Sequence, residues 1–327
     1  MRSRREIEEL AARLGARADI TERVVRLLGI LERLATHELT RERWVLKGGT
    51  ALNVFHFDLP RLSVDLDLNF LGAATADDLQ RERPEFERAL EACCALEECR
   101  VRRAPSEWAG GKFFLRYESV VGSGGQLELD VNYVARVPLL GVERRAPRWM
   151  ELGGATEIPT LRLEELAAGK CHALMTRSAS RDSFDACMLL ELRPELFSAP
   201  EFRLAFTVVA AASRTDFRAL PATPPVLDAR EIANKLLPVL RVVGGTTRPS
   251  AEELERRFSD VLQPQIARLL DWSPGERRFL DRLLDDGELE PDRLTDDAEL
   301  QDRVRRQPML QWKRQHVRKR LGFDQGP

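Results

Sequence analysis

Two aspartates separated by a single residue are the first feature of this chain that could perform chemistry. They lie in the segment Ser63 to Asn69, in which polar and apolar residues alternate. Because successive side chains of a β-strand point to opposite faces, Asp65 and Asp67 are expected on one face. Two carboxylates this close repel each other unless a cation lies between them, and Mg²⁺ or Mn²⁺ prefers such oxygen ligands. The spacing therefore predicts a divalent metal site.

A second alternating segment, Leu127 to Asn132, offers a third carboxylate. Its apolar residues share one face, and Glu128 and Asp130 share the opposite one. If the two strands are neighbours, Asp130 completes a three-carboxylate metal site with Asp65 and Asp67, and Glu128 is the less favoured candidate. Metal ions held in this way activate an attacking hydroxyl and stabilise a leaving pyrophosphate. By itself the pattern is weak, because the solvated faces of ordinary strands alternate in the same way.

A glycine pair upstream of the aspartates makes the chemical interpretation more specific. Gly48 and Gly49 end the apolar run Trp44 to Leu46, and a predicted helix begins at Thr50 and extends through Phe57. A lone glycine pair is usually only a turn, but backbone amides at a helix N-terminus can hold phosphate oxygens. The order of strand, glycine turn, helix and Asp-x-Asp strand is much more specific than either motif alone, and it favours a site that binds metal and phosphate.

Two polar residues flank the aspartates and could take part in the same site. The hydroxyl of Ser63 could bind a triphosphate oxygen, and the guanidinium of Arg61 could pair with a phosphate. Arg61 could equally neutralise the acidic strand. We favour the phosphate-binding role for both residues.

The elements that position these residues follow from hydrophobic periodicity. Helical spacing predicts helices over 6–37, broken near Gly15, and over 75–99, with Thr75 as N-cap. Alternation predicts strands over 63–70, 112–121 and 126–134, the last two joined as a hairpin. Beyond Pro159 the pattern is almost wholly helical, with loops predicted at 221–225 and 244–247. We therefore predict an α+β fold, with a mixed-sheet domain over 1–155 and a mostly helical domain over 156–327.

Composition narrows the possible partners and the cellular compartment. The 51 basic and 53 acidic residues give a formal net charge of −2, so the total charge indicates no particular partner. The five cysteines are irregularly spaced and odd in number, which favours reduced thiols. No apolar run is long enough to span a bilayer, and the N-terminus has no secretory signal pattern. We expect a cytoplasmic protein with no membrane contact.

The glycine turn and the aspartate strand resemble those of a known family. Lys47 to Leu52, followed by Arg61 to Leu68, resembles the DNA polymerase β-type nucleotidyltransferase superfamily. More closely, it resembles the AbiEii/AbiGii toxin family, whose members are the toxins of type IV toxin–antitoxin and abortive-infection systems. The fold implied is a polymerase β-like nucleotidyltransferase domain with a mixed sheet, followed by a mostly helical C-terminal domain.

The resemblance continues downstream and covers residues 44 to 190 in all. Leu163 to Lys170, then Arg177 and Arg181 to Asp185, is similar to the lysine motif and the Arg-Asp motif of the family. Gly169 stands where the family usually has Glu. Taken singly, these residues have ordinary structural interpretations: a solvated lysine, a helix N-cap at Asp182 and a helix salt bridge between Arg181 and Asp185. Their order behind the aspartates favours the functional interpretation.

The resemblance also implies roles for individual residues. Lys170 contacts the nucleotide phosphates, and Asp182, in preference to Asp185, is the essential downstream acid. The catalytic set is then Asp65, Asp67, Lys170 and Asp182, and the metal ligands are Asp65, Asp67 and Asp130. The nucleotide-binding residues are Lys47, Gly48, Gly49, Thr50, Arg61, Ser63 and Asp185.

The reaction implied is Mg²⁺-dependent transfer of a nucleotide from an NTP to an RNA acceptor. The expected acceptor is a tRNA 3′ end, whose blockage stops translation, and the expected partner is a cognate antitoxin encoded nearby. Two alternatives stay open. The nucleotide or a phosphoryl group could be transferred to a protein side chain, or the chain could be a non-catalytic NTP-binding module.

A basic C-terminal segment could contact nucleic acid, because phosphate neutralisation dominates such binding. Only Asp302 and Asp324 are acidic in this segment, and Trp312 and His316 are interleaved. A solvated terminal helix explains the same pattern equally well. The basic residues are Arg303, Arg305, Arg306, Lys313, Arg314, Arg318, Lys319 and Arg320.

Overall fold

The computed structural model describes residues 2–73, 75–105, 109–154, 156–223, 227–242 and 247–323. The chain forms two compact units. Unit 1 contains Met1–Arg136, Val142–Leu161 and Leu236–Pro249, and unit 2 contains Val137–Gly141, Arg162–Lys235 and Ser250–Pro327. The domain boundary after residue 155 stays a prediction, and residue 155 itself lies outside the described residues. So do Asp324, residues 224–225 of the first predicted loop and residues 244–246 of the second.

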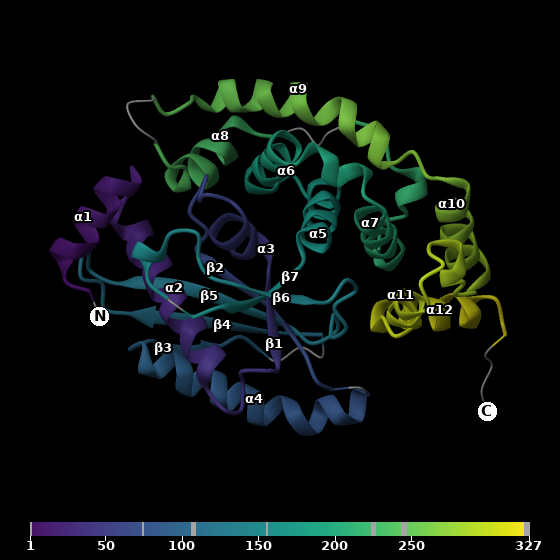
Figure 1. The fold of residues 1–327 in the computed structure, drawn as a ribbon, viewed down its shortest axis with the longest axis horizontal. Helices are drawn as coiled ribbons and strands as arrows, with labels where there is room; N and C mark the ends of the chain where they lie inside the picture. Colours follow the sequence, from purple (N-terminus) through teal and green to yellow (C-terminus); the bar gives the residue numbers. More distant parts are fainter. Residues whose placement is uncertain are drawn as a thin grey trace. The chain divides into compact units, whose positions relative to one another are not determined.

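The helices of unit 1 form where periodicity and capping residues predict them. Helix α1 (Arg4–Leu14) ends at Gly15, whose φ of 61° is left-handed, and α2 (Ala18–Thr36) follows. The glycine tolerates this conformation because it lacks a Cβ. Helix α4 (Ala76–Leu96) starts at the predicted N-cap Thr75, which forms a capping box with Asp78. Helices α2 and α4 pack against each other and against the sheet (Figure 1).

Unit 1 is built around a seven-stranded mixed sheet with the order β3-β4-β5-β2-β1-β7-β6 (Figure 1). The pairs β1–β7 and β2–β5 are parallel, and the other neighbours are antiparallel. The sheet is thus mixed, as predicted. The strands are β1 (Trp44–Lys47), β2 (Asp65–Phe70), β3 (Arg100–Arg103), β4 (Gly110–Tyr117), β5 (Gly125–Asn132), β6 (Val142–Arg145) and β7 (Ile158–Leu161).

Strand β2 begins at Asp65, two residues later than the alternation predicts. The residues before it contact Leu236–Pro249, the last segment of unit 1. The Leu62 amide donates to the Val239 carbonyl at 2.8 Å, and Arg61 forms an isolated bridge with Leu240. Sequence alternation cannot reveal this contact, because its partners are more than 170 residues apart.

The helix after the glycine turn also differs from its prediction at both ends. It begins at Gly48 as α3 (Gly48–Thr50) and continues as a π-helical turn, η1 (Ala51–His56). Phe57 is already extended. The helix therefore starts directly at the end of β1, and the glycines form its first turn.

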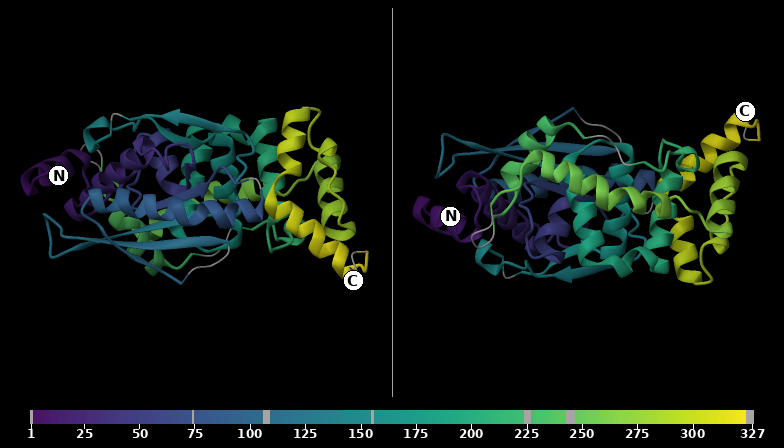
Figure 2. Two further views of the ribbon diagram at one scale, coloured as in Figure 1. Left: turned by 90° about the horizontal axis from the view of Figure 1, so that it is seen from below. Right: turned by 90° about the horizontal axis from the view of Figure 1, so that it is seen from above.

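The regular elements in the described segments of unit 2 are all helices or helical turns, which confirms the predicted α+β class with a mostly helical C-terminal part. Helix α9 runs along α6, and α10, α11 and α12 pack together with α7 and the short turns near them (Figure 2). The α-helices are α5 (Leu163–Thr176), α6 (Ser180–Leu192), α7 (Pro200–Ala212), α8 (Ala229–Glu231), α9 (Ala251–Leu269), α10 (Pro274–Asp281), α11 (Ala298–Arg305) and α12 (Pro308–Arg320).

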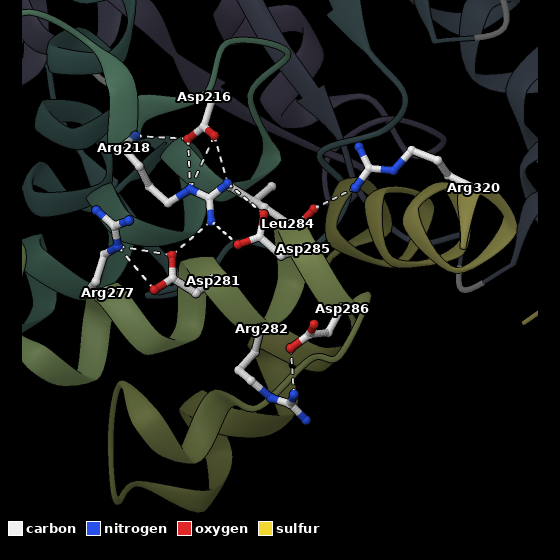
Figure 3. A network of polar contacts seen from close by, with 9 residues as sticks. All are labelled: Asp216, Arg218, Arg277, Asp281, Arg282, Leu284, Asp285, Asp286 and Arg320. Atoms are coloured by element: carbon white, nitrogen blue, oxygen red, sulfur yellow. Dashed lines mark hydrogen bonds and ion pairs between the residues drawn. The ribbon is translucent and has the colours of Figure 1, made fainter. Parts of the chain in front are cut away.

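One arginine connects several parts of unit 2 (Figure 3). Arg218 donates to Asp216 in its own turn, to Asp281 at the end of α10 and to Asp285 just beyond it. Hydrogen bonds to these carboxylates hold the pKa of Arg218 above its usual range. The side chain is only 13% exposed, so the interactions are shielded from solvent on the arginine's side. This network has a structural role.

Much of the basic C-terminal segment is engaged inside unit 2. Arg303 pairs with Glu299, Arg306 with Asp302 and Arg318 with Glu288. Lys313 and Arg320 donate to backbone carbonyls of the same unit. These contacts favour the structural interpretation of the segment over nucleic-acid binding.

The five cysteines are buried and free, as expected for reduced thiols. None of the helices in the described parts of the chain combines the length and the apolar character that crossing a membrane requires.

Candidate active site

The acidic residues of β2 and β5 are direct neighbours in the sheet of unit 1. The two strands are parallel and adjacent, with Asp67 opposite Asp130 and Asp65 opposite Glu128. Residues opposite each other share a face, so the four carboxylates line one face of the sheet. The apolar residues between them are buried on the other face. The role of Asp130 required the two acidic strands to be neighbours, and they are.

The glycine turn lies against the same carboxylates. Gly48 has a φ of 72°, and a Cβ at this position would collide with the carboxylate of Asp67. A Cβ on Gly49 would collide with the guanidinium of Arg61 and lie 3.0 Å from the hydroxyl of Ser63. The backbone of the turn thus approaches three of the predicted site residues so closely that a side chain at either glycine would displace one of them. This approach explains both glycines.

Two of the predicted phosphate ligands are buried below the turn. Arg61 is 2% exposed and Ser63 is 4% exposed. Arg61 donates from Nη1 to the Leu62 carbonyl at 3.3 Å. A buried guanidinium is expensive to leave without anionic or carbonyl partners, so it is suited to a fixed position beside phosphate.

Thr50 has a structural task within this arrangement. Its hydroxyl donates to the Asp65 carbonyl at 2.6 Å, and the residue is fully buried. The Thr50 side chain therefore connects the glycine turn to the start of β2. Binding of nucleotide by Thr50 stays a prediction, and in this geometry it would involve the backbone amide.

Asp130 has a cationic partner that the sequence interpretation did not identify. Lys112 of β4 lies opposite Asp130, and its Nζ is 3.0 Å from Glu128 and 3.3 Å from Asp130. Burial raises the pKa of Asp130, the Lys112 ammonium opposes this rise, and the negative charge of Asp67 adds to it. The alternation of 112–117 could have revealed Lys112, because it places this residue on the same face as the acidic residues.

The donor set fits a hard divalent cation. Carboxylate oxygens are the preferred ligands of Mg²⁺, and the repulsion between Asp67 and Asp130 is relieved by a cation. Within the described parts of the chain, however, no three His, Cys, Asp or Glu side chains converge closely enough to hold a metal ion. Asp65 and Asp67 are the metal ligands we favour, and the role of Asp130 as a third ligand stays a prediction.

A cavity of about 380 Å³ opens beside the carboxylates. It brings basic, acidic and amide side chains together around a backbone rich in glycine, which suits a polar, charged ligand. Its lining includes Lys47, Asp67, Gly110, Gly111, Lys112, Asp130 and Asn132. Lys47 enters this site as the cross-strand partner of Asp67.

The downstream motif residues form a separate ionic cluster in unit 2. Lys170 of α5 contacts Asp182 at 3.0 Å and Asp185 at 2.7 Å, both on α6. Arg177, between the two helices, contacts the second oxygen of Asp182 at 2.6 Å. The structure thus brings together Lys170, Arg177 and the two aspartates, and both aspartates contact the lysine.

Burial makes this cluster electrostatically strong. Lys170 is 8% exposed, Asp182 is 2% exposed and Asp185 is fully buried. Burial by itself would raise the pKa of Asp182, but Lys170 and Arg177 outweigh it and hold that pKa below its usual range. Asp182 is therefore ionised at neutral pH, and Lys170 is oriented by two charged hydrogen bonds.

Gly169, the departure from the family pattern, leaves α5 intact. The helix continues from Leu163 to Thr176 through this residue. A Cβ at Gly169 would have no neighbour within 4 Å. The position is exposed, so the glycine does not disturb the packing of Lys170.

These features are typical of a nucleotidyltransferase: a mixed sheet carries a carboxylate pair and a glycine turn at the start of a helix. The family model described as "Nucleotidyl transferase AbiEii toxin, Type IV TA system" matches residues 29–307. The chain belongs to this family of nucleotidyltransferase toxins of type IV toxin–antitoxin systems.

A solved structure supports the fold. MenT4, a nucleotidyltransferase toxin from Mycobacterium tuberculosis H37Rv, is similar over 94% of this chain and 99% of its own, with a TM-score of 0.56. The sequence identity is 15%, so this likeness concerns the fold. No curated protein matches the sequence of the chain.

Proposed function

We propose that this chain transfers a nucleotide from an NTP to an RNA acceptor, a tRNA 3′ end, in a reaction that requires Mg²⁺ or Mn²⁺. The observation that carries the proposal is the close approach of the Gly48–Gly49 turn to Asp67, Arg61 and Ser63. It combines phosphate-binding groups with carboxylates suited to a metal in one small region. A toxin of this class has a cognate antitoxin, and we expect its gene beside that of this chain.

Residues of unit 1 have distinct tasks in this proposal. The amides of Gly48 and Gly49, with Ser63 and Arg61, hold the triphosphate. Asp65 and Asp67 hold the divalent cation, which when bound polarises the phosphate oxygens. Lys47, beside Asp67 in the sheet, adds positive charge next to the phosphates.

The transfer itself requires one bond to form and one to break. The acceptor hydroxyl oxygen bonds to the α-phosphorus of the NTP, the bond between this phosphorus and the bridging oxygen breaks, and pyrophosphate leaves. The hydroxyl proton is released. Negative charge grows on the leaving pyrophosphate, and fixed positive groups stabilise such charge most effectively where water is scarce.

Lys170 has this stabilising task in the proposal. Its ammonium is held at a fixed position by Asp182 and Asp185. A lysine fixed in this way needs little reorganisation when charge develops on a phosphate. Asp182 is then a positioning residue for Lys170, and direct contact of Asp185 with the nucleotide stays a proposal.

The test is incubation of the purified chain with each labelled NTP, Mg²⁺ and total RNA. We expect label on RNA with the wild type and loss of at least about a hundredfold in rate with Asp65→Ala, since the metal would lose a carboxylate ligand. Asp77→Ala, on the exposed first turn of α4, is the matched control and keeps full activity. Absence of label with every nucleotide, or equal label with Asp65→Ala, would refute the proposal.

The same product identifies the acceptor. Label that is removed by ribonuclease and survives protease is on RNA, as proposed. Label that is removed only by protease would assign the reaction to a protein side chain. Mg²⁺-dependent binding of NTP without any turnover would assign the chain to non-catalytic nucleotide binding.

A further inference from the structure

The face of the sheet that carries the catalytic carboxylates continues across β4 and β3 as a basic surface. Asp65 lies opposite Glu128, Glu128 lies opposite Phe114, and Phe114 lies opposite Arg102. Two residues further along each strand, Arg116 lies opposite Arg100 in the same antiparallel pair. Because opposite residues share a face, the arginines project from the same side of the sheet as the aspartates.

We propose that Arg100, Arg102 and Arg116, the β3–β4 arginine surface, bind the single-stranded RNA of the acceptor and lead its end to the carboxylates. This inference rests on the proposed function for the identity of the acceptor. The partner is defined by chemistry: a flexible polyanion with bases that can stack. Strand β3 is the edge of the sheet (Figure 1), so a long RNA chain can leave the surface there.

Charge balance is the first support for the proposal. All three arginines are exposed, and none forms an ion pair with a carboxylate within the residues that the structure describes. Arg103, their neighbour on the opposite face, pairs with both Glu87 and Glu91 of α4. The positive charges on the carboxylate-bearing face thus remain available for an external anion.

The pairing of two arginines is the second support. Arg100 and Arg116 are directly opposite in neighbouring strands. Like charges in this position repel and destabilise the strand pair. Folding stability therefore does not account for the pair, whereas a phosphate between the two guanidinium groups would relieve the repulsion.

The third support is a stacking platform. The guanidinium of Arg102 lies over the ring of Phe114, 4.7 Å from its centroid. Single-stranded RNA is recognised largely by bases that stack on aromatic rings and on arginine planes. The Phe114–Arg102 pair offers such a plane between the carboxylates and the sheet edge.

The dimensions suit the end of an RNA strand. Three strand spacings of about 4.8 Å separate β2 from β3, which places Arg102 about 14 Å from the aspartate strand. Stacked nucleotides repeat about every 3.4 Å along one strand, so about four nucleotides span this distance.

A surface cavity lies beside the arginines and leaves room for a ligand. Its volume is about 730 Å³, and all three arginines line it. Glu98 and Glu118 also line the cavity, but neither forms an ion pair with these arginines within the described parts of the chain. The more basic C-terminal segment is a weaker candidate, because Arg303, Arg306 and Arg318 have partners inside unit 2.

A structural role predicts a different behaviour of the same residues. Charged side chains on an edge strand prevent it from pairing with strands of other molecules. Such protection depends on the presence of charge and is preserved when arginine is replaced by glutamate. RNA binding depends on the sign of the charge, so the same change replaces attraction for phosphate by repulsion and weakens binding.

The experiment measures binding of a fluorescently labelled, mixed-sequence single-stranded oligoribonucleotide to the full chain by anisotropy, at several salt concentrations. The variant is R100E/R116E, which keeps a like-charged pair in the sheet. Each phosphate contact to a single strand contributes about 0.7 to the slope of log K against log salt. Loss of two phosphate contacts reduces the magnitude of this negative slope by about 1.4 and weakens binding about 25-fold at 0.1 M salt.

The matched control is R41E/R88E, which makes the same charge change at two exposed arginines of unit 1 away from this face. We expect it to bind RNA within about twofold of the wild type. Equal weakening in both double variants, unchanged binding in R100E/R116E or no binding by the wild type would each overturn the proposal.

Stability gives a second, independent measurement. The single variant R100E replaces repulsion across β3 and β4 by attraction, so its melting temperature stays the same or rises while RNA binding falls at least fivefold. A fall in melting temperature that tracks the loss of binding would show a structural role instead. Asp65→Ala should bind RNA normally, so failure of nucleotide transfer and failure of RNA binding are distinguishable.

Discussion

Replacement of Lys170 by methionine should destabilise unit 2 strongly, because it removes the cation from a buried ionic cluster. Lys170 contacts Asp182 at 3.0 Å and Asp185 at 2.7 Å, and the two aspartates are 2% and 0% exposed. Methionine fills a similar volume, so the change is mainly electrostatic. Removing one partner of a buried ion pair costs about 3–5 kcal/mol, since the remaining charge stays buried. Arg177 still contacts Asp182, which favours the lower end of this range.

The pH dependence has a definite sign. In the wild type the pKa of Asp182 is held below its usual range, so its ionisation contributes stability that is present above about pH 4 and is lost as the pH falls further. In Lys170→Met, the buried carboxylates bind protons more readily than in the unfolded chain. The deficit of the variant is therefore largest near neutral pH and shrinks as the pH falls toward about 4.

Calorimetry between pH 4 and pH 7.5 measures this difference. A deficit of 3–5 kcal/mol lowers the melting temperature by about 6–20 °C for a unit of this size. Hydrogen exchange of α5 and α6 should locate the loss. Lys235→Met, an exposed lysine in unit 2, is the control and should change the melting temperature by less than about 2 °C. A wild-type melting curve for Lys170→Met, or a deficit independent of pH, would refute this account.

Two glycine substitutions should act in opposite directions. Gly48→Ala forces alanine to a φ of 72° and against Asp67, so we expect a loss of about 1–2 kcal/mol and weaker NTP binding, measured by denaturation and by nucleotide titration. Unchanged NTP affinity would contradict the phosphate-binding role of the turn. Gly169→Ala adds a methyl group in open space in the interior of α5, so we expect a gain of about 1 kcal/mol with unchanged NTP affinity. A loss of stability in this variant would show a packing role for Gly169.

Local sequence pattern was sufficient for several features of this protein. Alternation in 63–69 and 127–132 places Asp65, Asp67 and Asp130 on polar faces because the side-chain period of a strand is two. The capping residue Thr75 marks the start of α4, and Gly15 marks the end of α1, because both act on groups within one turn of the chain. The motifs also identified the family, which the family model confirms.

Tertiary structure decided what these local patterns could not. The alternation of polar and apolar residues predicts which face of a strand a residue occupies, but it does not predict which strands are neighbours. The parallel pairing of β2 with β5 makes Asp130 the neighbour of Asp67, and the pairing of β5 with β4 adds Lys112. The pairing of β4 with β3 extends the carboxylate face to Arg100 and Arg102.

The same distinction applies to Lys170 and to the glycine turn. An isolated lysine on a helix is usually solvated, and only the packing of α5 against α6 buries it between two aspartates. A glycine pair is usually a turn, and only the approach of Asp67, Arg61 and Ser63 shows which side chains a larger residue would displace. The sequence by itself determined which residues we propose for the chemistry, because types and spacing are local properties. Their partners depend on contacts between segments distant in sequence, which only the folded chain brings together.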